Sequence, residues 1–155
     1  MTTVVAPESP RTGDVVELLE RHLAHMRSLS PPGHVHALDL DALCAPDVTF
    51  LTARRSDGTL VGIGALKELC PTHGELKSMH VSIELRGQGL SRVVLTALLD
   101  LARARCYQRV SLETGSMDGF VPARTLYASV GFVECEPFGD YTVNPYSTCM
   151  TLSLS

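Results

Sequence analysis

The stretch IELRGQGLSR, residues 83–92, places Gly87 and Gly89 between an alternating apolar segment and a segment with helical spacing. Each glycine costs roughly 0.5–1 kcal/mol relative to alanine inside a regular element, so we expect a function that offsets this cost. Such a loop can turn backbone N–H groups towards one point, and the following helix adds unpaired amides and its positive dipole end. A Cβ at either glycine would block the close approach of an anion. The stretch therefore predicts a cradle for a phosphate or pyrophosphate.

Two common nucleotide-binding loops do not match this stretch. A P-loop needs a lysine after its last glycine, and none is present. A dinucleotide fingerprint needs a third glycine where this chain has Arg92, and a meander precedes the loop. A different phosphate-bearing ligand and a plain turn from strand to helix remain open.

The periodicity on either side of the loop predicts a meander, then a β-α-β crossover, then a helix and a hairpin. Asp14 and Glu17 resemble a capping box at the start of the first helix. Helices are expected from Asp14 to the SPPG stop at 30–33, near 37–43, from Leu90, and over 123–130 with Gly131 ending it. Strands are expected over 48–53, 59–66, 74–83, 109–114, 131–138 and 147–154.

Composition favours one packed domain over residues 1–155, with residues 1–12 as a loosely ordered tail. Apolar residues make up 45% of the 155 residues and charged residues 19%, and no apolar run is long enough for a membrane span. The first residues do not resemble a signal peptide. The net charge of −4 argues against a general nucleic-acid binder, although the arginines between 86 and 109 suit a small polyanion. Five scattered cysteines without a C-x-x-C pair argue against a disulfide framework or zinc site and favour the cytoplasm.

Two segments carry a resemblance to a known family. LRGQGLS, preceded by KSMHV, resembles the acetyl-CoA signature Q/R-x-x-G-x-G/A of the GNAT superfamily of N-acetyltransferases. ARTLYASVGF (123–132) resembles the family's A-x-x-L-Y-x-x-x-G-F segment, and it follows at the right distance. LETGSM, PAR-x-LY and PFGDY are similar to a subgroup of small bacterial members. The resemblance covers roughly residues 48–154.

This resemblance implies a mixed α/β (α+β) fold with a mostly antiparallel central sheet and helices on both faces. The sheet would splay between strands 76–83 and 109–114, and acetyl-CoA would lie in the opening as co-substrate, with no metal. Its pyrophosphate would meet the amides of 86–91, and its thioester would lie beside the 79–81 backbone. The implied cofactor-binding residues are Met79, His80, Val81, Arg86, Gly87, Gln88, Gly89, Leu90, Ser91, Arg92, Phe120, Arg124 and Tyr127.

Direct transfer to an amine needs a proton acceptor and a proton donor. Tyr127 matches the family tyrosine that protonates the thiolate of CoA, and a tyrosine packed in the core is the alternative. Glu75 and Glu113 are candidates for the general base, with Glu68 as a third. For each carboxylate, a solvated or salt-bridged side chain is the alternative.

Histidines and basic residues are the candidates for acceptor binding. His34 and His36 lie on a loop where the family builds acceptor specificity, and Lys77 and Arg124 are candidates for an acceptor carboxylate. His80 stands where the subgroup has arginine and could contact the substrate. His22 and His25 are three residues apart, but without a further ligand they predict no metal site.

Three other residues depart from the family pattern. Ser91 replaces a glycine or alanine, and Phe120 replaces an asparagine that contacts CoA. Cys106 stands where the family has glycine, and since cysteine tolerates a left-handed backbone poorly, we expect a different helix end there.

The sequence therefore predicts an N-acetyltransferase that moves an acetyl group from acetyl-CoA to a primary amine of a small, amino-acid-like molecule by direct attack. The alternatives are a protein lysine or N-terminal acetyltransferase and a non-catalytic acyl-CoA sensor. No nucleic-acid or membrane partner is expected. The strand over 147–154 could pair at an edge with a second copy, which leaves a homodimer open.

Overall fold

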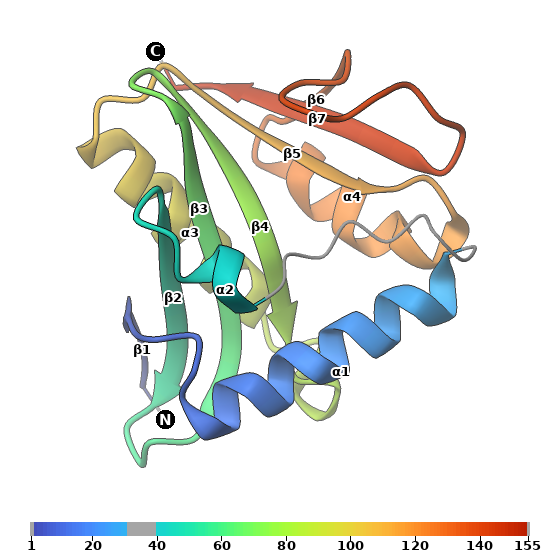
Figure 1. Cartoon of the computed structure of the whole chain (residues 1–155). Coiled ribbons are helices and arrows are strands. Elements are labelled where there is room, and N and C mark those ends of the chain that lie inside the picture. Colours follow the sequence, from blue (N-terminus) through green and yellow to red (C-terminus); the bar gives the residue numbers. More distant parts are fainter. Residues whose placement is uncertain (1, 31–39, 155) are drawn as a thin grey trace.

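A seven-stranded sheet forms the centre of the computed structural model, which describes residues 2–30 and 40–154 (Figure 1). The spatial order of the strands is β1-β2-β3-β4-β5-β7-β6, and every neighbouring pair is antiparallel except β4 and β5. The strands are β1 (Thr3–Pro7), β2 (Val48–Arg55), β3 (Leu60–Cys70), β4 (His73–Val81), β5 (Arg109–Gly115), β6 (Val133–Cys135) and β7 (Ser147–Ser153). The helices are α1 (Gly13–Leu29), α2 (Leu40–Leu43), α3 (Leu90–Ala104) and α4 (Val121–Ser129), with short 3-10 turns η1 (Ile83–Leu85) and η2 (Asp118–Phe120).

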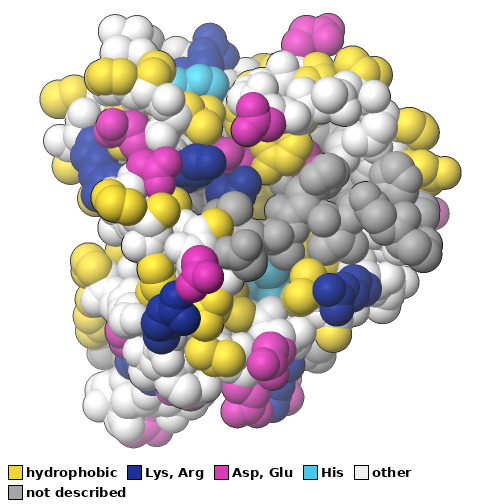
Figure 2. All heavy atoms as spheres, in the orientation of Figure 1, with side chains coloured by type: hydrophobic (Ala, Val, Ile, Leu, Met, Phe, Trp, Pro, Cys, Tyr) yellow, Lys and Arg dark blue, Asp and Glu magenta, His cyan; other side chains and the backbone are white. Residues whose placement is uncertain are grey.

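The helices cover both faces of the sheet, as expected. α3 and α4 lie behind the sheet in Figure 1, and α1 and α2 lie in front of it. Val94 and Leu98 of α3 pack onto β3 at Gly64, where an added Cβ would lie 2.8 Å from Leu98 and 2.9 Å from Val94. Val15 of α1 and Ile63 of β3 belong to a second buried cluster on the opposite face. Acidic and basic side chains are interspersed over the front surface (Figure 2).

The central sheet opens between β4 and β5, which confirms the predicted splay. These two strands pair only from His73 opposite Arg109 to Leu76 opposite Leu112. Just beyond this register, the pairing of β3 with β4 shifts, and Ser78 adopts a left-handed backbone with φ 56°. A bulge bends its strand locally. The residues that follow therefore diverge from β5 (Figure 1).

The amino-terminal segment corrects one expectation. Residues 3–7 are not part of a loose tail, because Thr3 to Pro7 pair with Arg55 to Leu51 as edge strand β1. The segment is short and has no clear alternation of apolar and polar residues, so it becomes a strand only through its pairing with β2.

The predicted capping box is also wrong. α1 begins after Thr12, whose side chain makes no capping hydrogen bond. Asp14 instead accepts hydrogen bonds from the guanidinium of Arg54 at 2.7 and 2.9 Å, and Glu8 binds the same guanidinium at 2.7 Å. A tertiary ion pair has replaced the local cap.

The last two strands differ from their predicted roles. The strand expected over 131–138 is limited to β6, residues 133–135. β7 lies between β5 and β6 and is not an edge strand, so the reasoning that suggested a homodimer does not hold.

The end of α3 contradicts the expectation for Cys106. This residue is left-handed with φ 62°, its N–H donates to Arg103 O at 3.0 Å, and Tyr107 N–H donates to Ala102 O at 3.1 Å. These two bonds form a Schellman motif, the usual glycine-ended helix terminus. Cys106 therefore occupies a position that normally favours glycine, and its backbone is strained there.

Replacing Cys106 with glycine should stabilise the protein. Left-handed backbone costs a non-glycine residue roughly 1–2 kcal/mol, and the added entropy of glycine in the unfolded chain offsets about 0.5–1 kcal/mol of that gain. We expect Cys106→Gly to raise the melting temperature by about 2–3 °C, measured by thermal unfolding. Cys106→Ala is the control, because it removes the thiol and retains the strain. Equal melting temperatures for the two variants would contradict the assignment.

Candidate functional site

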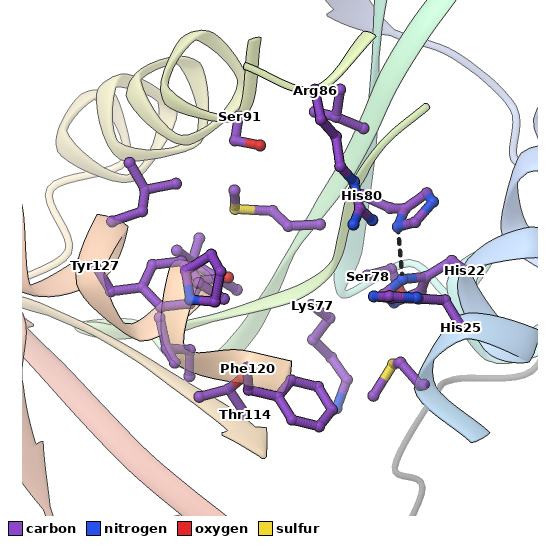
Figure 3. A pocket seen from close by; sticks show the side chains of 18 of the residues that line it. His22, His25, Lys77, Ser78, His80, Arg86, Ser91, Thr114, Phe120 and Tyr127 are labelled. Carbon is purple, nitrogen blue, oxygen red and sulfur yellow. Dashed lines mark hydrogen bonds between the residues drawn. The ribbon is translucent and has the colours of Figure 1, made fainter. Parts of the chain in front are cut away.

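A cavity of about 450 Å³ lies where β4 and β5 diverge (Figure 3). Its walls come from α1, β4, the loop before α3, the first residues of α3, β5 and α4, and from Tyr141. Because the opening interrupts the middle of the sheet, ionisable side chains of β4 and β5 face a common interior. The cavity is therefore the candidate site.

The glycine loop forms one end of this cavity. Gly87 has φ +85° and Gly89 has φ +76°, a backbone region that side chains disfavour. Gly89 is the N-cap residue of α3 and provides no side-chain cap, so the first helix amides are available to a ligand. An added Cβ at either glycine would meet no protein atom within 4 Å. Positive φ thus gives a second reason for glycine, beside the close approach of an anion.

Most residues expected to bind the cofactor line the cavity. These are Met79, His80, Val81, Arg86, Gly87, Gly89, Leu90, Ser91, Arg92, Phe120 and Tyr127. Gln88 instead accepts a hydrogen bond from Arg55 at 2.8 Å, outside the lining. Arg124 also lies outside the lining and donates to the carbonyl oxygens of Gly115 and Met117 at 2.6 and 3.1 Å.

The other predicted residues are divided in the same way. Glu75, Lys77 and Glu113 line the cavity. Glu68 does not, and it accepts a hydrogen bond from Tyr107 at 2.8 Å. His34 and His36 lie outside the described residues.

Tyr127 lies on α4 with its side chain buried at the cavity wall. Burial raises the pKa of its phenol to about 12. Its ring packs edge-on against Phe132 with 5.8 Å between centroids. The hydroxyl is therefore held in a fixed position and protonated at neutral pH.

Glu75 belongs to a buried three-residue network. Its Oε2 accepts hydrogen bonds from Lys77 Nζ at 3.0 Å and from the Tyr141 hydroxyl at 2.6 Å. Lys77 Nζ also lies 2.9 Å from the Tyr141 oxygen. Burial and the neighbouring Glu75 raise the pKa of Tyr141, so its hydroxyl remains a donor. The network balances the buried charge of Glu75 with that of Lys77.

Glu113 lines the cavity from β5 and differs from Glu75 in its environment. Burial raises the pKa of its carboxyl to about 7, against the opposing effects of a hydrogen bond from Ser147 and the charge of Lys77. Ser147 Oγ donates to Glu113 Oε2 at 3.0 Å. A carboxyl with this pKa exchanges a proton near neutrality, as a general base requires.

Three histidines meet on the wall that α1 provides (Figure 3). His22 Nδ1 and His80 Nδ1 are 3.2 Å apart, and the rings of His25 and His80 lie 6.1 Å apart. Burial lowers the pKa of His22 to about 4 and that of His80 to about 3. Figure 2 shows a histidine in a recess between hydrophobic side chains on this face.

Sequence reasoning missed Tyr141, His22 and His25 as site residues. Tyr141 lies in the PFGDY segment that supported the family resemblance, and this was the available signal. His22 and His25 were considered only as metal ligands, because nothing local indicates that α1 places them beside His80.

A sheet opened between two parallel strands, with a glycine loop and helix N-terminus at the opening, is the arrangement expected of an acyl-CoA-dependent transferase. The model of the acetyltransferase (GNAT) family matches residues 16–132, and the chain belongs to this family. It is an acetyl-CoA-dependent N-acetyltransferase.

Relatives and solved structures agree with this assignment. The chain is 49% identical to YsnE of Bacillus subtilis, an uncharacterized N-acetyltransferase, over 90% of this chain and 92% of YsnE. It is 40% identical to an IAA acetyltransferase of Azospirillum brasilense, over 94% of each chain. A crystal structure from Klebsiella pneumoniae, assigned to the acyl-CoA N-acyltransferases, superposes with a TM-score of 0.81 at 26% identity, over 99% of this chain and 98% of that one.

The described residues contain neither a membrane-spanning helix nor a metal-binding cluster. Over residues 2–30 and 40–154, no helix has the length and apolar character to cross a membrane. In the same residues, no group of three or more His, Cys, Asp or Glu side chains is arranged to hold a metal ion.

Proposed function

We propose that the acetyl acceptor is the primary amine of a small, amino-acid-like molecule. The observation that carries this proposal is the buried set of ionisable groups around the cavity: Glu75, Lys77, Glu113 and Tyr141 all face the same interior. The cavity volume of about 450 Å³ is in the range of small-molecule sites. α1 contributes one wall of the cavity, which suits a compact acceptor better than an extended polypeptide.

The glycine loop fits the pyrophosphate of acetyl-CoA. Gly87 and Gly89 leave backbone amides exposed at the N-terminus of α3, and Arg86 and Arg92 line the same end of the cavity. We assign Gly87, Gly89 and Arg92 to the co-substrate. When bound, acetyl-CoA supplies an activated acetyl thioester.

We assign the general base to Glu113 rather than to Glu75. Glu75 is engaged by Lys77 and Tyr141, so removing a proton from the amine would require breaking that network. The pKa of Glu113, about 7, allows its carboxylate to accept the proton at neutral pH. Glu75 is then a positioning residue that orients Lys77 and Tyr141.

Tyr127 is assigned to protonate the departing sulfur. It keeps its proton at neutral pH because burial raises its pKa to about 12. Tyr127 lines the cavity (Figure 3).

An amine panel tests the acceptor class. Release of the CoA thiol should be fastest with one or more free amino acids or similar amines, and slower with lysine peptides, N-terminal peptides and polyamines. Thermal stabilisation by acetyl-CoA, measured in parallel, shows that the protein is competent to bind. Preference for a peptide would contradict the proposal. Stabilisation without thiol release from any amine would favour the sensor alternative.

Glu113→Gln should remove a pH-dependent step. The carboxylate accepts a proton only when it is ionised, so wild-type kcat/KM should rise as pH increases through about 7. The variant should lose kcat/KM by roughly 10²–10⁴-fold and no longer show this limb, measured from pH 5.5 to 9. Glu134→Gln, an exposed glutamate on β6, is the control. A limb near pH 7 that persists in Glu113→Gln would exclude this base.

Tyr127→Phe should lower kcat by roughly 10²-fold or more, because the sulfur loses its proton donor. Binding of acetyl-CoA should change little, since the ring still packs against Phe132. Steady-state kinetics and a binding titration measure the two effects. Tyr107→Phe is the control, because Tyr107 is a buried tyrosine outside the cavity lining. Equal losses in kcat and acetyl-CoA affinity would remove Tyr127 from the acid role.

A further inference from the structure

The histidine cluster of His22, His25 and His80 takes no part in the proton transfers assigned to Glu113 and Tyr127. His22 and His25 of α1 meet His80 of β4 on the cavity wall, and Arg86 points towards the same group (Figure 3). His80 is only 7% exposed, and its Nε2 is buried without a hydrogen-bond partner among the described residues. A buried polar atom without a partner is costly and marks a place where a ligand is expected.

The hydrogen bond between the two histidines limits what Nε2 can do. One Nδ1 must donate and the other must accept across the 3.2 Å contact. When neutral His80 accepts at Nδ1, its proton is on Nε2, which is then a buried donor on a residue that lines the cavity. When His80 donates at Nδ1, Nε2 is an acceptor and would suit an ammonium group.

A carboxylate only accepts hydrogen bonds and would therefore select the donor form of His80. Burial is the main cause of the lowered pKa of His80, and His22, Arg86, His25 and Arg21 lower it further. Because burial also lowers the pKa of His22 and of His25, the cations near His80 at neutral pH are Arg86 and Arg21. Glu84, on the turn after β4, pairs with Arg21 at 3.5 Å with both side chains exposed. This environment repels an ammonium group and attracts an anion.

Lys77, the basic residue that the sequence suggested for an acceptor carboxylate, is poorly placed to hold an anion. Lys77 Nζ already contacts Glu75 and Tyr141 at 3.0 and 2.9 Å. Glu75 and Glu113 also line this part of the cavity, and their negative charge would repel the carboxylate of an acceptor. The same carboxylates favour an amine. The part of the cavity near Glu75 and Glu113 therefore suits an amine, and the part near His80 and Arg86 suits an anion.

We propose that His80 Nε2, His22 and Arg86 form a subsite for the carboxylate of the acceptor, with the acceptor amine directed towards Glu113. This inference rests on the small-molecule acceptor proposed above and narrows it to amino carboxylic acids. It moves the carboxylate contact from Lys77 to the histidine cluster. His22 and His80 are specificity-determining residues for the reaction.

Matched acceptor pairs test the subsite. For each amino acid that the enzyme acetylates, kcat/KM is compared with that of the corresponding carboxamide, which keeps the amine and removes the anionic charge. We expect the acid to be preferred by about tenfold or more in the wild type, as for a hydrogen bond to a charged group. In His80→Leu the preference should fall to about one, mainly because the acid becomes a poorer substrate.

Two further variants keep the test independent of folding defects. Arg86→Gln changes an exposed loop residue and should also reduce the preference for the acid. His73→Leu is the matched control, because His73 lies on the same strand, bonds to Ser111 at 2.7 Å and does not line the cavity. It should leave the acid-to-amide ratio unchanged.

Each outcome supports or overturns the subsite. Equal activity on acid and amide in the wild type, or an unchanged preference in His80→Leu and Arg86→Gln, overturns it and leaves the small amine acceptor standing. Equal losses for acid and amide, with loss of thermal stabilisation by acetyl-CoA, overturn it in favour of contacts to the phosphates of CoA. If the wild type acetylates no small amine, both the subsite and the acceptor class are wrong.

Discussion

The site depends on the short register between β4 and β5. These strands pair from His73 to Leu76 on one side and from Arg109 to Leu112 on the other, and then separate. A continuous ladder would fill the middle of the sheet with paired backbone. The separation instead turns the following residues of both strands, among them Lys77 and Glu113, towards a shared cavity.

The protonation state of each ionisable group in the cavity depends on its burial and on its neighbours. Glu75 has Lys77 and Tyr141 as partners, whereas burial raises the pKa of Glu113 to about 7. The same physical effect acts with opposite sign on the histidines, because burial disfavours the charged imidazolium. One cavity thus holds a carboxyl group that titrates near neutrality at Glu113 and uncharged imidazoles at His22 and His80.

Features that depend on residues close together in the sequence could be predicted, whereas features that depend on contacts between distant residues were mostly missed. The glycine loop and α3 could be predicted because Gly87, Gly89 and the apolar stripe of the helix are neighbours in sequence. The opening of the sheet was predicted from the family resemblance. Strand β1 and the Asp14–Arg54 ion pair were missed because each needs a partner more than 35 positions away. Cys106 was misjudged because the Schellman hydrogen bonds hold a left-handed residue that glycine would occupy more easily.

The same contrast between local and distant contacts distinguishes the proposed co-substrate end of the cavity from the proposed acceptor end. The co-substrate end is built from backbone amides that two glycines and a helix terminus present, so its chemistry depends little on distant side chains. The acceptor end joins α1, β4, β5 and Tyr141, and its charge pattern exists only once these elements are packed together. Substitutions on α1 can therefore change the acceptor without disturbing the glycine loop. His80 lies on β4, the strand that contributes to both ends of the cavity, so the proposed choice of acceptor depends on the same strand that forms the opening in the sheet.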